Sequence, residues 1–246
     1  MAGHSKWANI KHRKARQDAK RAKIWTKVIR EITVAARLGG GSIEDNPRLR
    51  LAVDNALTSN MPRDTIERAI ERGAGGGEGS TVEEVSYEGY GPGGVAIFVE
   101  TMTDNRNRTV ASIRHLFSKH NGNLGTDGSV AYLFDKRGII QVEHCDDEDA
   151  LLEIALDSGA EDVENDDEGA TTILTLVEDF TSVINALRDA EIQLTSSEIA
   201  MIPNTSVPCD EDTTEKVQTL LEAFEDLDDV QNVYSNGEFT FSPDSS

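Results

Sequence analysis

A glycine-rich segment, from Gly73 to Ser80, divides the chain into two parts with different hydrophobic periodicities. Before it, apolar residues recur at steps of three and four, which predicts amphipathic helices. Beyond it, short strand patterns alternate with helical ones. The segment lacks the lysine of a phosphate-binding loop and follows a helix rather than a strand. We therefore interpret residues 74–80 as a flexible linker that follows a helical domain.

The order of the patterns beyond the linker predicts an α+β fold class, with a helical domain followed by two α/β domains. Residues 136–202 read strand, helix, strand, strand, helix, strand, the ferredoxin-like order βαββαβ. The flanking pieces, 81–135 and about 203–246, would together form the other α/β domain, with the ferredoxin-like domain inserted in it. The expected strands are 95–101, 130–134, 138–142, 161–164, 171–177, 192–195 and 230–234, and the expected helices are 104–117, 147–157, 181–190 and 213–224.

The first 73 residues predict three helices and a basic amino-terminal arm. The longest spans residues 8–38, with Trp25, Val28, Ile29, Ile32 and Ala36 on one apolar face. Asn-Pro at 46–47 and Asn-Met-Pro at 60–62 then begin helices at 47–58 and 62–72, since a polar cap followed by proline favours a helix start. Before residue 23 the apolar face disappears, so we expect that stretch to project from the body as an arm.

Charge is strongly segregated along the chain. Residues 1–80 carry a net charge of +7, residues 81–140 of −1 and residues 141–246 of −27, in a chain of −21 overall. The first 30 residues hold ten basic side chains against Asp18. This pattern predicts a nucleic-acid partner bound through the amino-terminal end, because so many cations repel one another unless an anion offsets them. The alternative is that these residues form a solvated face.

The candidate nucleic-acid-binding residues follow from that segment. Six of them recur at steps of three and four and share the helix face opposite the apolar stripe. The set is Lys6, Lys11, His12, Arg13, Lys14, Arg16, Lys20, Lys23, Lys27 and Arg30.

A second basic cluster begins the helix that follows the first strand of the α/β region. Arg106, Arg108 and Arg114 lie at or near a helix amino terminus, which is a natural seat for a phosphate. In the alternative interpretation, Asp104 caps the helix and the arginines pair with acids elsewhere in the fold.

Other chemistry is not indicated. The acidic stretches 146–149 and 164–169 loosely resemble a calcium loop, but the twelfth position of the second is Thr175, so we interpret them as helix-start acids and a hairpin turn. The five histidines and two cysteines lack zinc or nucleophile spacing. We expect no catalytic residue, metal, cofactor or small-molecule substrate. Two distant cysteines, no long apolar run and no signal peptide favour a reduced, cytoplasmic protein without a membrane partner.

Several segments together resemble one known family. Residues 2–14, AGHSKWANIKHRK, are similar to the start of the YebC/PmpR family, as are Asn-Met-Pro at 60–62, YEGYGP at 87–92, TDNRNRT at 103–109 and LDDVQ at 227–231. The resemblance runs essentially from end to end. It implies a helical domain followed by two α/β domains, and a cytoplasmic regulator of gene expression. Members are usually described as DNA-binding transcriptional regulators. The family also includes a mitochondrial translational activator, and bacterial members are linked to ribosomes stalled at proline runs.

Three function classes stay open. The helices at 47–58 and 62–72 allow a helix-turn-helix regulator, although Arg63 and Asp64 are the only candidates for reading bases. A basic arm with Trp7, Trp25 and His12 suits a translation factor that binds ribosomal RNA and the ribosome. The third class is a protein-interaction adaptor that acts through the acidic ferredoxin-like domain.

Overall fold

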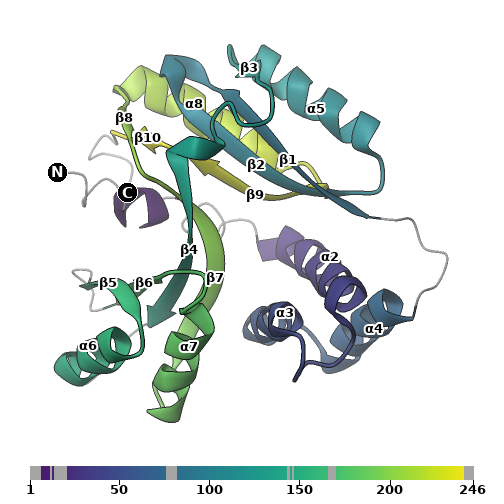
Figure 1. Cartoon of the computed structure of the whole chain (residues 1–246). Helices are drawn as coiled ribbons and strands as arrows, with labels where there is room; N and C mark the ends of the chain where they lie inside the picture. The colour runs from purple at the N-terminus through teal and green to yellow at the C-terminus, as the bar shows by residue number, and fades with distance from the viewer. Residues whose placement is uncertain are drawn as a thin grey trace. The chain divides into compact units, whose positions relative to one another are not determined.

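The computed structural model describes residues 7–11, 13, 21–75, 82–142, 145, 147–165 and 170–240 (Figure 1). Among these, two compact units form. The first takes the residues up to Lys27, 82–135 and 202–240, and the second takes 28–75 and 136–201. Residues 7–11 and 13 are helical. No helix in the described ranges combines the length and apolarity that a membrane crossing requires.

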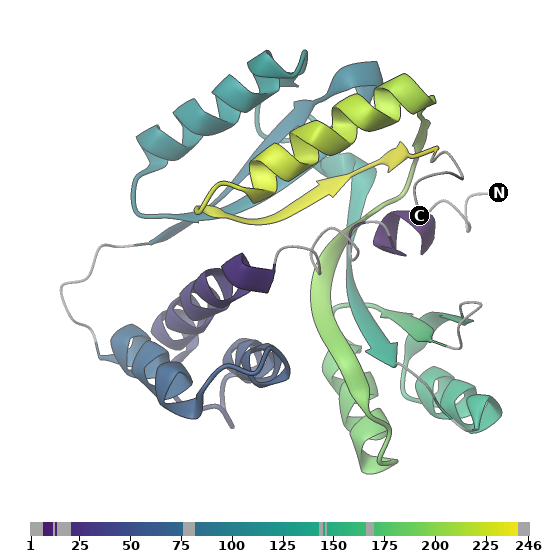
Figure 2. The same ribbon diagram turned by 180° about the vertical axis from the view of Figure 1, so that it is seen from behind.

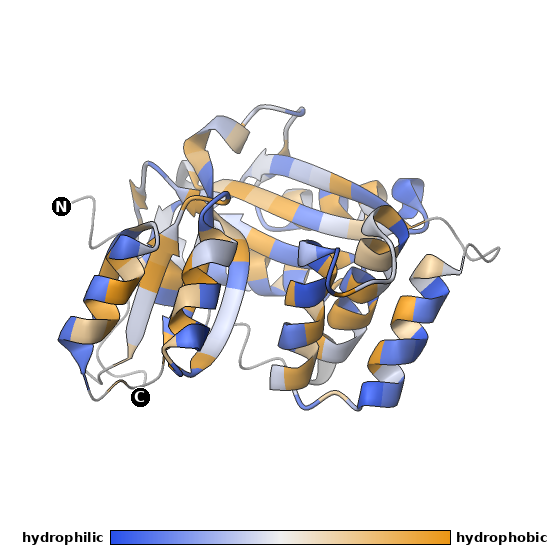
Figure 3. Cartoon of the chain, turned by 60° about the horizontal axis from the view of Figure 1, so that its bottom comes forward, coloured by the Kyte–Doolittle hydropathy of each residue, from blue (hydrophilic) through white to orange (hydrophobic). Residues whose placement is uncertain are grey.

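The helical region consists of α2 (Arg21–Gly39), α3 (Pro47–Thr58) and α4 (Arg63–Ala74). Their common core is formed by small and branched side chains, including Ile32, Leu49, Ala56 and Ile66. Figure 3 shows hydrophobic and hydrophilic residues side by side along most helices, as expected for helices that bury one face. At Gly73 the backbones approach closely, because a Cβ there would lie 2.3 Å from the carbonyl oxygen of Thr33.

Asn46 joins the end of α2 to the start of α3. Its side-chain oxygen accepts a hydrogen bond from the Leu49 amide at 3.0 Å. Its amide donates to the carbonyl oxygens of Ala35 and Gly40, at 2.8 and 2.9 Å. One buried side chain thus bonds to the backbone at the end of α2 and at the start of α3, which confirms the predicted cap.

The sheet of the first unit has the strand order β3-β1-β2-β9. Its elements are β1 (Glu83–Tyr90), β2 (Ala96–Thr103), α5 (Arg106–Lys119), β3 (Asn123–Leu124), α8 (Glu211–Glu225) and β9 (Val230–Ser235). Helices α5 and α8 lie side by side on one face (Figures 1 and 2), where Phe117 and Phe224 meet at 4.8 Å between ring centroids. Short elements complete the unit: 3₁₀ turns at Pro92–Gly94 and Ala131–Leu133, and the parallel pair β8 (Val207–Pro208) and β10 (Gly237–Glu238).

A buried carboxylate fixes the loop that follows β3. Glu88, which is 6% exposed, accepts hydrogen bonds from the backbone amides of Gly128, Val130 and Ala131 at 2.7–2.8 Å. Beside it, Gly89 has no room for a side chain, since a Cβ would lie 2.6 Å from the Phe117 ring. The YEGYGP segment therefore holds this loop against the sheet.

The sheet of the second unit has the strand order β5-β6-β4-β7, formed by β4 (Phe134–Val142), β5 (Ala160–Asn165), β6 (Thr171–Thr175) and β7 (Leu194–Pro203). With α6 (Glu148–Asp157) and α7 (Phe180–Asp189), the chain order is βαββαβ. Leu151 and Leu187 from the two helices pack on Ile140 and Ile173 of the sheet. The predicted α+β class and the ferredoxin-like order are both confirmed.

Three local predictions differ from the structure, among them the strand expected at 192–195, which begins at Leu194 and extends to Pro203 as β7. Strand β1 was missed, because Glu83–Tyr90 is rich in polar residues and glycine. The strand expected at 130–134 is a 3₁₀ turn followed by the start of β4. Of the expected 8–38 helix, the structure describes residues 8–11 and 13 and α2. Residues 12 and 14–20 lie outside the described residues, so one continuous helix stays a prediction.

Candidate nucleic-acid interface

The structure describes only part of the predicted basic face. Lys11, Arg13, Lys27 and Arg30 lie within the described residues. For Lys23 the structure describes the backbone, within α2, and not the side chain. The remaining candidates, Lys6, His12, Lys14, Arg16 and Lys20, lie outside the described residues.

Arg13 corrects the expectation that the amino-terminal stretch projects as an arm throughout. Its side chain is 4% exposed and lies over the ring of Tyr234, 5.2 Å from the ring centroid. Nearby, Asn9 donates to the carbonyl oxygens of Ser235 and Gly237, at 2.9 and 3.1 Å, and Ile10 is buried. A cation over an aromatic face is attracted by the ring's quadrupole. In this arrangement Arg13 holds the segment against β9 and is not exposed to a phosphate.

The other described candidates are more accessible. Lys11 is exposed, and Lys27 and Arg30 are half-buried on α2. The Lys27 ammonium donates to the carbonyl oxygen of Gln231 at 3.3 Å. The acid on α2 is Glu31, and it pairs with Arg48 at 2.6 Å.

Trp25 lies on the predicted side of α2 but outside the core that the three helices share. It shares the side of α2 that buries Ile32 and Ala36, but it is 40% exposed. Trp25 lies two helical turns before Ile32 and is absent from the core that the three helices share. The sequence pattern gave the correct side of the helix and could not show where that core ends.

Helix α4 has an outer face of balanced charge. Its exposed positions carry three arginines and three acids: Arg63, Asp64, Glu67, Arg68, Glu71 and Arg72. Arg68 pairs with Asp64. This helix would be the recognition helix of a helix-turn-helix, and a face with as many carboxylates as guanidinium groups is poorly suited to a phosphate backbone.

The three arginines predicted as a second phosphate site differ in their partners. Arg108 contacts Asp104 and Asp229, each at 2.8 Å, and these partners raise its pKa. Arg106 and Arg114 are exposed. The capping residue is Asn105 and not Asp104, since the Asn105 side chain accepts from the Arg108 amide at 3.0 Å.

Asp229 explains why two distant segments of the family pattern lie together. The same carboxylate oxygen accepts hydrogen bonds from Thr109 at 2.8 Å and Thr103 at 3.3 Å, besides its contact with Arg108. The TDNRNRT and LDDVQ segments thus form one buried network at the start of α5. The pairing of Arg108 has a partner 121 residues away, and no sequence spacing indicates it.

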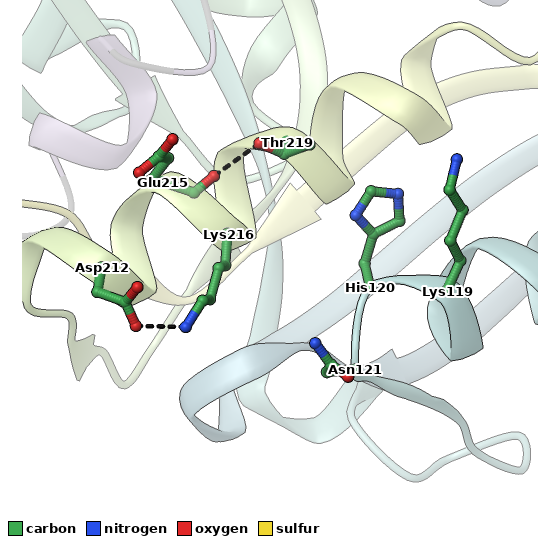
Figure 4. Close-up of a pocket in the computed structure, with 7 residues that line it drawn as sticks. All are labelled: Lys119, His120, Asn121, Asp212, Glu215, Lys216 and Thr219. Atoms are coloured by element: carbon green, nitrogen blue, oxygen red, sulfur yellow. Dashed lines mark hydrogen bonds and ion pairs between the residues drawn. The ribbon is translucent and has the colours of Figure 1, made fainter.

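A polar hollow of about 270 Å³ lies where the end of α5 meets α8 (Figure 4). Its seven lining residues are Lys119, His120, Asn121, Asp212, Glu215, Lys216 and Thr219. Lys216 pairs with Asp212. Burial lowers the pKa of His120, and Lys119 and His115 lower it further. The hollow therefore combines two lysines with two carboxylates and a histidine that favours its neutral form, a balance that does not select an anion.

The acidic stretches are described in part. Asp147 caps α6 by accepting from the Ala150 amide at 3.0 Å, and Glu148 and Asp149 occupy the first turn, so these acids lie at a helix start as predicted. Residues 166–169 lie outside the described residues. Within the described ranges, no three His, Cys, Asp or Glu side chains gather as a metal site would require.

Two family models match the chain. The model described as the TACO1/YebC protein N-terminal domain matches residues 5–76, and that of the TACO1/YebC second and third domain matches residues 82–237. Among solved structures, the chain is similar to a conserved hypothetical protein from Aquifex aeolicus, with 47% identity, a TM-score of 0.84, and coverage of 93% of this chain and 95% of that one.

Curated relatives are similar over nearly their whole length. A protein of Hahella chejuensis is 62% identical over 97% of this chain and 96% of its own length. A protein of Coxiella burnetii is 59% identical over 97% and 98%, and one of Pseudomonas savastanoi 61% over 97% and 96%. Each is named "Probable transcriptional regulatory protein". With both family models and these relatives covering almost every residue, the chain belongs to the TACO1/YebC family.

Proposed function

We propose that the protein regulates gene expression by binding a nucleic acid through its basic amino-terminal segment and the start of α2. The observation that carries this proposal is the segregation of charge, with ten basic residues and one acid in the first 30 positions of a chain whose net charge is −21. A polyanion relieves the repulsion among those cations, and release of its counterions favours binding. The proposed activity is binding and not catalysis.

The geometry of α2 supports phosphate contacts. Lys23, Lys27 and Arg30 follow one another at steps of four and three, so their positions share one side of the helix. With Arg13 buried, five residues of the predicted stripe remain: Arg16, Lys20, Lys23, Lys27 and Arg30. If they neutralise about five phosphates, log affinity against log salt should have a slope of roughly −3.5 for a single strand and −4.5 for a duplex.

Different observations favour duplex DNA and RNA as the target. The name of the relatives favours a transcriptional role, for which duplex DNA is the target. Two features of the helical region favour RNA as the second candidate. The outer face of α4 carries as many acids as arginines, and Trp25 is exposed on the basic helix, where an unpaired base could stack on it.

A pair of matched charge reversals tests the binding surface. Lys27→Glu/Arg30→Glu on α2 should weaken binding of a labelled nucleic acid more than tenfold in fluorescence anisotropy. Arg63→Glu/Arg72→Glu on α4 changes the net charge equally and should weaken it far less. The reverse order of effects would show that α4 is the binding helix. Lys11→Glu is a further single variant at an exposed position, and circular dichroism checks that each variant is folded.

Competition distinguishes DNA from RNA. Labelled ribosomal RNA is challenged with random duplex DNA, and then with the best duplex selected from that pool. A selected duplex that binds about a thousandfold better than the pool and displaces the RNA would establish operator recognition. Phosphate contacts without base readout give no such ratio, and salt-sensitive sedimentation with ribosomes would then support the translational role. If neither acid binds at low salt, the adaptor hypothesis replaces both.

A further inference from the structure

The ferredoxin-like domain has an exposed apolar patch in a strongly acidic surface. Residues 136–201 contain 18 acidic and three basic residues. Among the described residues of this range, the exposed large apolar side chains are Leu152, Leu156 and Val177, which are 42%, 48% and 42% exposed. None of them belongs to the domain's core, whose α6 members are Leu151, Ala155 and the partly buried Ile154.

These three side chains belong to segments that meet at one end of the domain. Leu152 and Leu156 are one turn apart on α6 and therefore adjacent on its surface. Val177 follows β6, whose last residue, Thr175, is paired with Ala160 just beyond α6. The same turn approaches the end of α6, because a Cβ on Gly159 would lie 3.1 Å from the Asp179 side chain. The end of α6 and the β6–α7 turn are therefore adjacent, and we treat their exposed apolar side chains as one patch.

Carboxylates border the patch on the helix itself. At 100° per residue, Asp149 and Glu153 fall on the same side of α6 as Leu152 and Leu156. Asp149, Glu153, Asp157 and Glu178 are all exposed, and within the described ranges no ion pair involves them. The two leucines are therefore flanked by negative charge that nothing described in the chain offsets.

We infer that this patch, defined by Leu152, Leu156 and Val177, is a docking site for a basic amphipathic helix of another protein. A partner helix with apolar residues at steps of three and four would cover the leucines, and lysines or arginines beside them would face Asp149 and Glu153. Exposed apolar groups rimmed by charge are typical of interaction sites. A phosphate backbone would be repelled here, so the site differs in partner and location from the proposed nucleic-acid surface.

Binding of a defined peptide to the full-length protein tests this inference. The probe is a fluorescein-labelled helix of 18 residues with leucine at steps of three and four and lysine elsewhere. A second probe replaces every leucine with glutamine at the same charge. The protein should bind the leucine probe at least tenfold more tightly than the glutamine probe in anisotropy at physiological salt. Equal binding of both probes would show charge attraction without an apolar site, and would overturn the inference.

Matched protein variants locate the site. Leu152→Ser/Leu156→Ser should weaken binding of the leucine probe at least tenfold. Leu38→Ser/Leu57→Ser removes two exposed leucines from the helical region instead. This control should leave the affinity for the leucine probe within twofold of the wild type. Asp149→Asn/Glu153→Gln, which keeps the leucines, should also weaken binding and reduce its salt dependence. Unchanged binding in the first and third variants would refute the site. So would a self-association in sedimentation that Leu152→Ser/Leu156→Ser abolishes, since a second copy would then be the occupant.

Discussion

The two sheet domains have the same layers and use their acidic residues differently. Each places two helices on one face of a four-stranded sheet. The first is assembled from segments on either side of the ferredoxin-like insertion, and its carboxylates Glu88 and Asp229 are buried and hydrogen-bonded. The second is continuous in sequence, and the buried polar residues among its described positions are the hydroxyl residues Thr171, Thr175 and Ser197.

The difference follows from chain connectivity. When a long insertion separates two parts of one domain, the loss of chain entropy on joining them must be offset by contacts between the parts. Asp229, from the second part, binds Thr103, Arg108 and Thr109 of the first. The continuous domain has no such seam, so its acids can remain on the surface and give the domain its negative charge.

Among the substitutions that test this comparison, removal of the Glu88 carboxylate should lower the free energy of unfolding most. Glu88→Ala removes the acceptor of the amides of buried Val130, half-buried Ala131 and exposed Gly128. At about 1–3 kcal/mol for each of the two less accessible donors, we expect a loss of roughly 2–6 kcal/mol in unfolding free energy. Urea denaturation measures it. Glu148→Ala, at an exposed position of α6, should cost far less. Equal losses would contradict the distinction between buried and surface acids.

Asp229→Ala should cause the next largest loss of unfolding free energy, about 3 kcal/mol. It leaves the buried Thr103 hydroxyl without its acceptor and removes the shared carboxylate that Thr109 and Arg108 also contact. Arg108→Ala should cost less, since Asp229 keeps both hydroxyl partners. The double variant should lose less unfolding free energy than the two single variants lose together, as expected for residues in contact. Additive losses in urea denaturation would show that the contact does not couple the two segments.

Removal of the side chain that caps α8 should lower the stability less, and by an amount that depends on pH. Hydrogen bonds from Thr213 lower the pKa of Asp210. A carboxyl group with a lowered pKa in the folded state stabilises the protein above its unfolded pKa, and this contribution is lost as the pH falls through the folded pKa. Asp210→Ala should therefore lower the melting temperature at pH 7, and the difference from the wild type should shrink in strong acid. A difference that is constant with pH would contradict the assignment.

Calcium should have the smallest effect. Millimolar calcium should leave the melting temperature nearly unchanged, apart from weak screening of the −27 charge of residues 141–246. Differential scanning calorimetry at increasing calcium concentration measures this. A shift of many degrees at micromolar calcium would instead reveal a specific site in the acidic domain.

The elements with strong periodicity and caps were predictable, and those defined by distant partners were not. Asn46 and Pro47 identified the start of α3, and the ferredoxin-like order followed from alternating apolar patterns. Strand β1 was missed because its burial depends on Glu88 reaching amides about 40 residues away, and a buried carboxylate looks like a surface residue in sequence. Trp25 was assigned to the correct helix side, but its exposure depends on the extent of the neighbouring helices.

The sequence by itself determined the segregation of charge, the family pattern, and most of the helices and strands, because these depend on residues close together in the chain. The tertiary structure decided the environment of each basic residue. It placed Arg13 over Tyr234, paired Arg108 with Asp229, and left the two leucines of α6 exposed among carboxylates. The physical reason is that the environment of a charge depends on every group within a few ångströms, and those groups come from segments more than a hundred residues apart.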